Sequence, residues 1–299
     1  MRREFTVTAV GLSCVALLLA GCGKGGNGAG GAPAAPRKAV IAACGSDTMV
    51  NLAQMWAEEY HKVCPDVSVE VSGGGSGVGI RDLATGIIDL ADSSRDISAS
   101  EREQAKQNTG KEPKEWRVAY DGIAVYVHKD NPLESLTTEQ LAAIYGEGGT
   151  IERWSQLGVK LPNDDIIRIS RQNNSGTYVY FREHVLGKKD FKLGSRDMSG
   201  SKDVVELVAR TPGGIGYSGM GYKIADVKFV KIAAKAGELA VDPTIANVHD
   251  KLYSLARPLF MYTLGEPPAH VKSYLDWILS PAGQRIVEQA GYVPVVALP

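Results

Sequence analysis

The chain has 299 residues, a formal net charge of −1 at pH 7 and 44% hydrophobic residues. This near-neutral balance lacks the basic excess that nucleic-acid-binding proteins use to neutralise phosphates, so we expect no nucleic-acid partner. The length is sufficient for one large domain or two ordinary ones.

The N-terminus has the pattern of a bacterial lipoprotein signal. Arg2 and Arg3 form a short basic segment, and residues 10–20 are apolar but too few to span a bilayer comfortably. The segment ends in Leu-Ala-Gly-Cys, so we expect cleavage before Cys22 and lipidation of its thiol. The alternative is an ordinary signal peptide, or an N-terminal helix with a cysteine by chance.

These observations predict a domain order that begins with a signal peptide at 1–21 and a flexible tether at 22–37. The tether is rich in Gly, Ala and Pro, a composition typical of linkers. No later apolar run reaches transmembrane length. We therefore expect an extracytoplasmic protein, in the periplasm or at the cell surface, that is held at the membrane by its lipid.

Two cysteines, Cys44 and Cys64, remain in the body of the chain. They flank a predicted helix of about 16 residues, which spans roughly 24 Å. A disulfide needs Cα atoms within about 7 Å. We therefore expect no Cys44–Cys64 bond, although the compartment permits disulfides.

After the tether, strand and helix patterns alternate. Three strands separated by two helices argue for a parallel sheet with helices on its faces. The pattern continues to the C-terminus. Strands are predicted at 40–44, 67–72, 87–91, 120–128, 166–170, 215–218, 227–232 and 258–264, and helices at 48–63, 77–85, 138–145, 176–186, 268–279 and 283–290.

Three segments share one design, in which a strand ends, glycine or hydroxyl residues follow, and a helix begins. They are residues 45–48, 73–77 and 174–177. A helix start presents unpaired N–H groups and the positive end of the helix dipole, which favours anions. Arg171, four residues before Ser175, adds a planar fork of donors. Each feature has an alternative interpretation. Ser46 or Asp47, and likewise Ser175, could be plain N-caps, residues 73–77 could form a tight glycine turn, and Arg171 could form a surface salt bridge.

The ordered motifs GSDTM, GGGSGVGIRDLATGIIDLADSSR, SRQNNSGTYVYF and TPGGIGYSG, with the ending LSPAGQRIVEQAGYVPV, resemble the phosphate-binding proteins of high-affinity phosphate ABC transporters. The resemblance covers about residues 38–297. It implies an α/β fold of the two-lobed periplasmic-binding-protein type (type II), with two α/β domains joined by two crossover strands. Lobe 1 would comprise 38–120 and 260–299, and lobe 2 would comprise 121–259.

The same resemblance implies a phosphate site between the lobes, with the chain parting near 120–122 and rejoining near 258–261. It also implies inorganic phosphate as the ligand and a permease and ATPase complex as the partner. We further expect a monomer with neither a cofactor nor a metal. The matching positions are Ser46, Asp47, Thr48, Ser76, Ser94, Arg171, Ser175, Gly176 and Thr177.

Two positions depart from the pattern of better-known members. Ser94 stands where those members carry an aspartate that accepts the proton of hydrogen phosphate, and Asn173 stands where many have an acid beside the arginine. If phosphate is the ligand, we expect Asp47, or otherwise Asp92, to accept that proton. Sulfate, tungstate and molybdate are the alternative ligands.

An enzyme, such as a secreted phosphate-ester hydrolase, is the alternative from another class. The five histidines are scattered along the chain, and no H-E-x-x-H, G-x-S-x-G or G-x-x-x-x-G-K-[ST] motif is present. Hydroxyls, backbone N–H groups and one arginine bind an anion without attacking it. We therefore expect a binding protein.

Overall fold

The computed structural model describes residues 38–298, so the predicted signal peptide, Cys22 and the tether lie outside the described residues. Within this part of the chain, none of the helices combines the length and the apolar character that crossing a bilayer requires.

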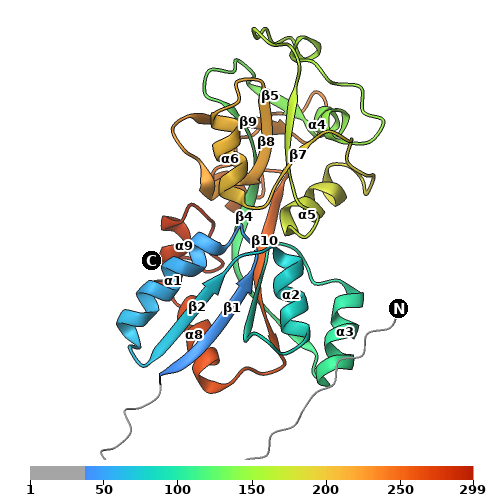
Figure 1. The fold of residues 1–299 in the computed structure, drawn as a ribbon. Helices are drawn as coiled ribbons and strands as arrows, with labels where there is room; N and C mark the ends of the chain where they lie inside the picture. Colours follow the sequence, from blue (N-terminus) through green and yellow to red (C-terminus); the bar gives the residue numbers. More distant parts are fainter. Residues whose placement is uncertain (1–37, 299) are drawn as a thin grey trace, which may run out of the picture. The chain divides into compact units, whose positions relative to one another are not determined.

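Lobe 1 begins with three parallel strands. β1 (Ala39–Gly45) lies between β2 (Val67–Ser72) and β3 (Leu90–Ser93), joined by α1 (Val50–Val63) and α2 (Ser76–Ala84). Each helix returns the chain to the same edge of the sheet, so the carboxyl ends of β1 and β3 and the start of α2 lie together (Figure 1).

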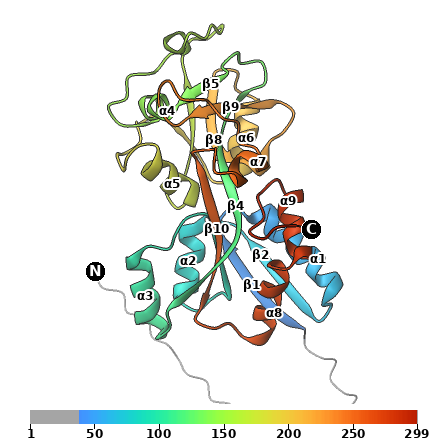
Figure 2. The same ribbon diagram turned by 180° about the vertical axis from the view of Figure 1, so that it is seen from behind.

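The rest of lobe 1 comes from both ends of the chain. α3 (Ala99–Thr109) packs against α2. α8 (Ala269–Ile278) and α9 (Pro281–Gln289) pack against α1 and against each other, on the side of the molecule that faces the viewer in Figure 2. The core here contains Trp56, Tyr274 and Val287, all with 0% exposure.

Lobe 2 has its own core, which includes Tyr126, Trp154, Phe181 and Tyr217. β6 lies between β7 and β8 and runs parallel to both, while β5 pairs with β9. The elements are β5 (Ser135–Thr137), α4 (Thr138–Tyr145), a 3-10 turn (Trp154–Leu157), β6 (Ile167–Arg171), α5 (Gly176–His184), β7 (Arg196–Met198), α6 (Ser201–Ala209), β8 (Gly214–Gly219), a second 3-10 turn (Met220–Tyr222), β9 (Val227–Ala233) and α7 (Ile245–His249).

Two long strands connect the lobes. β4 (Pro113–His128) and β10 (Ala256–Leu264) run antiparallel and side by side (Figure 1). β4 pairs with β10 as far as Gly122 and then, from Ile123, with β8. The lobe boundaries given above remain a prediction.

The expected fold class is confirmed, with some differences in its elements. β4 and β10 add antiparallel pairing to the parallel strands of each lobe. α1 begins at Val50 because residues 47–49 form a turn, and the strand expected at 87–91 is β3, which begins at Leu90. Ile87 is 72% exposed and lies in the turn after α2.

The sequence patterns did not predict α3, α6, α7, β5, β7 or the first half of β4. α3 buries only Ala105, so it has no apolar stripe to detect. The expectation for the cysteines is confirmed: Cys44 and Cys64 are not bonded to each other and lie at opposite ends of the α1 connection.

Candidate functional site

Hydroxyl groups from both lobes meet where the crossover strands pass between them. We call Ser46, Thr48, Ser76, Ser94, Thr177 and Ser201 the hydroxyl cluster; each is at most 1% exposed. Within lobe 1, Ser46 Oγ donates to Ser94 Oγ at 2.9 Å, and Ser76 Oγ lies 3.4 Å from Ser94 Oγ. Across the lobes, Thr48 Oγ1 lies 3.0 Å from Thr177 Oγ1 and 3.5 Å from Ser201 Oγ.

Glycine residues allow the two lobes to approach each other closely at this contact. A Cβ on Gly176 would come within 2.4 Å of Ser76 Oγ and 2.5 Å of Ser94 Oγ. Gly75 has a φ of +92°, and a Cβ there would lie 2.7 Å from the carbonyl oxygen of Asn174. The starts of α2 and α5, which carry the positive ends of two helix dipoles, are thereby brought face to face.

Ser175, a predicted phosphate-binding residue, is not part of the hydroxyl cluster. Its Oγ accepts from the backbone N–H groups of Thr177 and Tyr178, at 3.1 and 3.5 Å, and so caps α5. The N-cap alternative therefore describes the side chain of Ser175 in the structure. Whether this hydroxyl also meets a ligand stays a prediction.

Arg171 is the charged group that reaches the hydroxyl cluster from β6. Its guanidinium donates to Ser201 Oγ, to the carbonyl oxygen of Ser199 and to Asp47 Oδ2, each at 2.8 Å. Among the described residues its Nε has no partner. Burial lowers the pKa of Arg171, while the charge of Asp47 opposes that shift. An arginine remains protonated regardless, so the site contains a buried cation with an unused donor.

Asp47 is the acid that holds Arg171. Its Oδ1 accepts from the N–H of Gly74 at 2.9 Å, while Oδ2 forms the ion pair with Arg171 across the lobes. Because Asp47 pairs with Arg171, an acid at position 173, where this chain has the exposed Asn173, is not needed to hold the guanidinium. That Asp47 also accepts a ligand proton stays a prediction.

Asp92, the second candidate acceptor, lies below the site rather than in it. It alternates with Ala91 along β3 and so shares the face of Leu90, which packs in the core with Tyr274. Its side chain is 1% exposed, and its Oδ1 has no hydrogen-bond partner among the described residues. Burial raises the pKa of Asp92 to about 7.

Several residues around the cluster were not predicted from the sequence. Tyr222 Oη donates to the carbonyl oxygen of Asp47 at 2.5 Å, and Tyr292 Oη donates to that of Thr48 at 2.7 Å, so both tyrosines hold the loop after β1. Ser201 begins α6, a fourth helix start at the site. The Ser-Gly-Ser-Lys-Asp run at 199–203 is a cap-like signal that would have indicated it.

Arg257 and Asp121 were also missed, because each is an isolated charge in an apolar strand and belongs to no motif. Both are at most 1% exposed. Arg257 Nε and Nη2 donate to Asp121 Oδ2 at 3.1 and 2.9 Å. Burial raises the pKa of Asp121, and the charge and hydrogen bonds of Arg257 oppose that shift.

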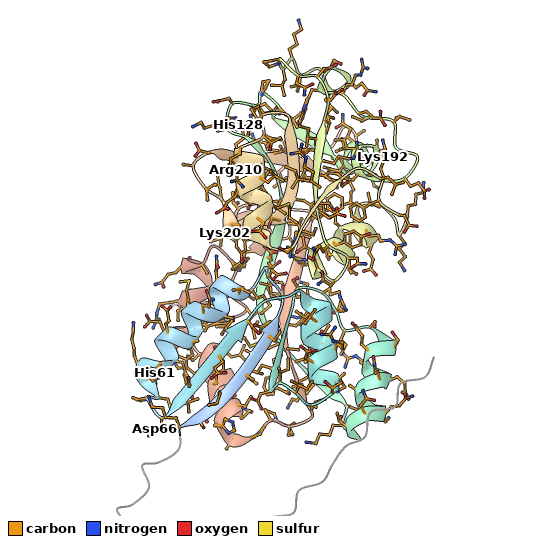
Figure 3. All side chains as sticks on the ribbon, viewed as in Figure 1. His61, Asp66, His128, Lys192, Lys202 and Arg210 are labelled. Carbon is orange, nitrogen blue, oxygen red and sulfur yellow. The ribbon has the colours of Figure 1, made fainter. Side chains whose placement is uncertain are left out.

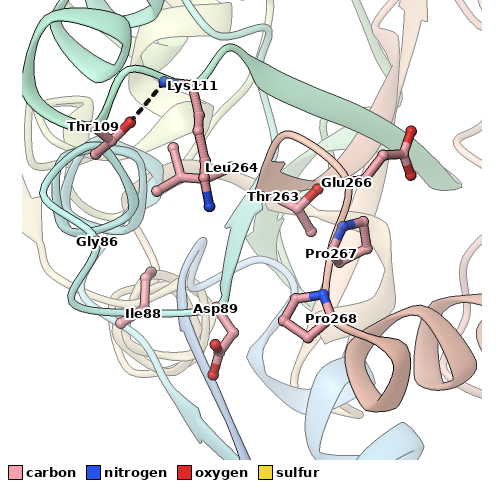
Figure 4. A pocket seen from close by; sticks show the side chains of 10 residues that line it. All are labelled: Gly86, Ile88, Asp89, Thr109, Lys111, Thr263, Leu264, Glu266, Pro267 and Pro268. Atoms are coloured by element: carbon pink, nitrogen blue, oxygen red, sulfur yellow. Dashed lines mark hydrogen bonds between the residues drawn. The ribbon is translucent and has the colours of Figure 1, made fainter.

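Other parts of the described chain offer less chemistry. Residues 38–298 contain no group of three or more His, Cys, Asp and Glu side chains placed to hold a metal. His61 and His128 lie in different lobes (Figure 3). A cavity of about 500 Å³, lined by Asp89, Lys111 and Glu266 among others, lies where β3 begins, at the opposite edge of the sheet from Ser94 (Figure 4).

Comparison with known proteins decides the family. Residues 30–282 match the PBP superfamily domain. The phosphate-binding protein PstS of Pseudomonas aeruginosa is 35% identical over 269 aligned residues, and the match covers 86% of this chain and 83% of that protein. This chain belongs to the PstS family of the PBP superfamily.

Further PstS relatives and solved structures agree. PstS of Staphylococcus aureus is 31% identical over 93% of this chain and 84% of its own length. A phosphate ABC transporter substrate-binding protein of Clostridium perfringens, solved with bound phosphate, superposes with a TM-score of 0.77 at 31% identity, covering 86% of this chain and all of that one. An ABC-type phosphate transport receptor of Vibrio cholerae gives 0.67 at 28% identity and covers 85% of this chain and 99% of that one.

Proposed function

We propose that this protein is an extracytoplasmic binding protein that captures inorganic phosphate between its two lobes and delivers it to an ABC importer. The observation that carries the proposal is the hydroxyl cluster with buried Arg171, whose Nε has no hydrogen-bond partner within residues 38–298. Hydroxyls, helix starts and a guanidinium are donors, and a tetrahedral oxyanion presents four acceptors. The relatives' names, which specify phosphate, support this choice of anion.

Calorimetry tests the proposal directly. The purified protein should bind phosphate with a stoichiometry of one, and tungstate, molybdate and sulfate should bind more weakly. Chloride at the same ionic strength is the control for a general salt effect. Absence of phosphate binding would refute the assignment, and stronger binding of another oxyanion would identify that anion as the ligand.

Asp47 is the proposed basis of the choice between phosphate and sulfate. A carboxylate repels a dianion unless a proton lies between them, and hydrogen phosphate carries a proton that sulfate lacks. A carboxylate that faces a bound dianion without a proton between them loses this hydrogen bond, at a cost of at least about 1–3 kcal/mol, which corresponds to roughly tenfold to a hundredfold in affinity. Asp47→Asn should therefore weaken phosphate binding and let sulfate bind measurably. If both anions weaken by the same factor, Asp47 acts only by holding Arg171.

The lipid anchor is a separate proposal, which rests on the sequence ending in Leu-Ala-Gly-Cys22. Cys22→Ala should leave unprocessed precursor or release the protein into the soluble fraction, because no thiol remains to carry diacylglycerol. Mass spectrometry and membrane fractionation of the wild type and the variant provide the measurement. An unchanged mass and distribution would contradict it.

A phosphate-ester hydrolase remains the alternative from another class, and it is not favoured, because the relatives are named as binding proteins. We also propose that the protein acts as a monomer, with the permease and ATPase of the importer as its partner.

A further inference from the structure

Arg257 connects the crossover strands to both halves of the hydroxyl cluster. It lies on β10 directly opposite Asp121 of β4 in the antiparallel register. Besides the two bonds to Asp121, its Nη1 donates to the carbonyl oxygen of Ser94 at 2.9 Å. Its Nη2 donates to Thr177 Oγ1 at 2.9 Å and to Thr48 Oγ1 at 3.2 Å. One guanidinium thus contacts lobe 1, lobe 2 and the strand between them.

These contacts determine what the two threonine hydroxyls can do. A guanidinium has donors only, so neither Thr48 Oγ1 nor Thr177 Oγ1 can donate to Arg257, and each must direct its own proton elsewhere. They lie 3.0 Å apart, and only one of them can donate to the other at a time. At least one hydroxyl proton is therefore directed away from Arg257 and from this pair, either toward Ser201 Oγ, which lies 3.5 Å from Thr48 Oγ1, or toward a bound acceptor such as an oxyanion.

Asp121 keeps Arg257 in this position and balances its charge. The carboxylate is 0% exposed, and its Oδ1 also accepts from the N–H of Met220 at 3.2 Å, which ties it to the end of β8. A buried arginine without this partner would leave an uncompensated charge, which is strongly unfavourable. The pair therefore acts as one unit, placed where β4 changes partner from β10 to β8.

We propose that Arg257, held by Asp121, is a positioning residue for the bound oxyanion: it orients the hydroxyls of Thr48 and Thr177 as donors when the lobes are together. It acts through these hydroxyls and through the joined lobes, and not by touching the ligand. The inference rests on the proposed function and goes beyond it, since it assigns part of the affinity to the crossover strands.

Arg257→Lys is the first test, because lysine keeps the charge but is a point donor that cannot reach Asp121, Ser94 and both threonines together. Calorimetry should show at least a tenfold rise in the Kd for phosphate. Ile144→Ala is the matched control, since Ile144 is a fully buried core residue on α4 outside the site. It should lower the melting temperature of the ligand-free protein while leaving the Kd within twofold of the wild-type value.

A double-mutant cycle separates positioning from general stability. Thr177→Val should weaken phosphate binding, and Arg257→Lys should then add a smaller further loss than it causes in the wild type, because one of its two target hydroxyls is gone. If Arg257→Lys reduces affinity by the same factor in both backgrounds, or by less than twofold in the wild type, the inference is wrong.

A second variant tests the other member of the pair. Asp121→Asn leaves the arginine in place without its charged partner, and it should also raise the Kd by at least several-fold; an unchanged Kd would overturn the inference. If the wild type binds phosphate and these variants do not differ from it, only this inference fails. If the wild type binds none of phosphate, sulfate and tungstate, the proposed function fails and this inference fails with it.

Discussion

At the residue scale, Arg171 and Asp47 form the charged contact between the lobes. We predict that Arg171→Ala weakens phosphate binding at least tenfold, because a charge-assisted hydrogen bond contributes about 1.5–3 kcal/mol. The loss also frees Asp47 to repel the anion. Calorimetry measures the change, and Arg182→Ala, which removes an exposed arginine paired with Asp190 in the same lobe, is the control. An affinity within twofold of the wild type would exclude Arg171 from the site.

Asp92 makes stability depend on pH. Burial raises the pKa of its folded-state carboxyl from 3.8 to about 7, so between these values the folded protein binds more protons than the unfolded chain. The stabilisation from its protonated form is fully present below about pH 3.8 and is lost as the pH rises to 7. The slope is at most about 1.4 kcal/mol per pH unit.

Urea unfolding of the ligand-free protein from pH 4 to 8 tests this sign. The free energy of unfolding of the wild type, relative to Asp92→Asn, should fall as the pH rises to 7 and should then level off. Asp276→Asn, an exposed change on α8, should leave the wild-type pH profile unchanged. Parallel profiles for the wild type and Asp92→Asn would contradict the assignment of the titration to this carboxyl.

At the scale of elements, the start of α5 must approach the start of α2. We predict that Gly176→Ala weakens phosphate binding at least tenfold, because the added Cβ would lie 2.4 Å from Ser76 Oγ and 2.5 Å from Ser94 Oγ. The backbone of Gly176 is not in the left-handed region, so alanine should not disturb the helix itself. The melting temperature of the ligand-free protein should therefore change little.

Small-angle X-ray scattering with and without phosphate is the second measurement for Gly176→Ala. The wild type should become more compact with phosphate, and the variant should respond less, since its lobes cannot come fully together. Equal compaction and equal affinity in both proteins would show that the serine hydroxyls move aside without cost.

Elements with a clear capping or hydrophobic pattern were predictable from the sequence, and there is a physical reason why the other elements lack such a pattern. α4 begins and ends at the predicted residues: Thr137 and Gln140 form a capping box at its start, before an apolar face, and Gly146 in extended conformation follows its last residue. The first half of β4 was not predicted because Lys114, Glu115 and Arg117 interrupt its alternation. Their long side chains lie at the surface of lobe 1, where β10 supplies the pairing.

At the scale of the whole molecule, phosphate should stabilise the closed protein. A ligand that binds only the folded state adds RT ln(1 + [L]/Kd), about 4 kcal/mol at a thousandfold excess over Kd. We predict that millimolar phosphate raises the melting temperature by several degrees, and that equimolar chloride does not. Differential scanning calorimetry measures the shift, and a melting curve insensitive to phosphate would count against a folded-state site.

The sequence by itself determined the order of most strands and helices that carry the site, α6 excepted, and it placed helix starts at Gly77 and Gly176 with an arginine nearby. These properties are local: a cap, a glycine run and an apolar period depend on residues within one or two turns. The family motifs extended them to a two-lobed fold, which the structure confirms.

Only the tertiary structure decided how the charges are paired. Asp47 is 124 residues from Arg171, and Asp121 is 136 residues from Arg257, so no local pattern relates the partners. The first pair forms where two lobes meet, and the second where two antiparallel strands come into register. Because a buried charge requires a partner wherever the fold can supply one, the pairing depends on the packing of distant elements and not on neighbours in the chain.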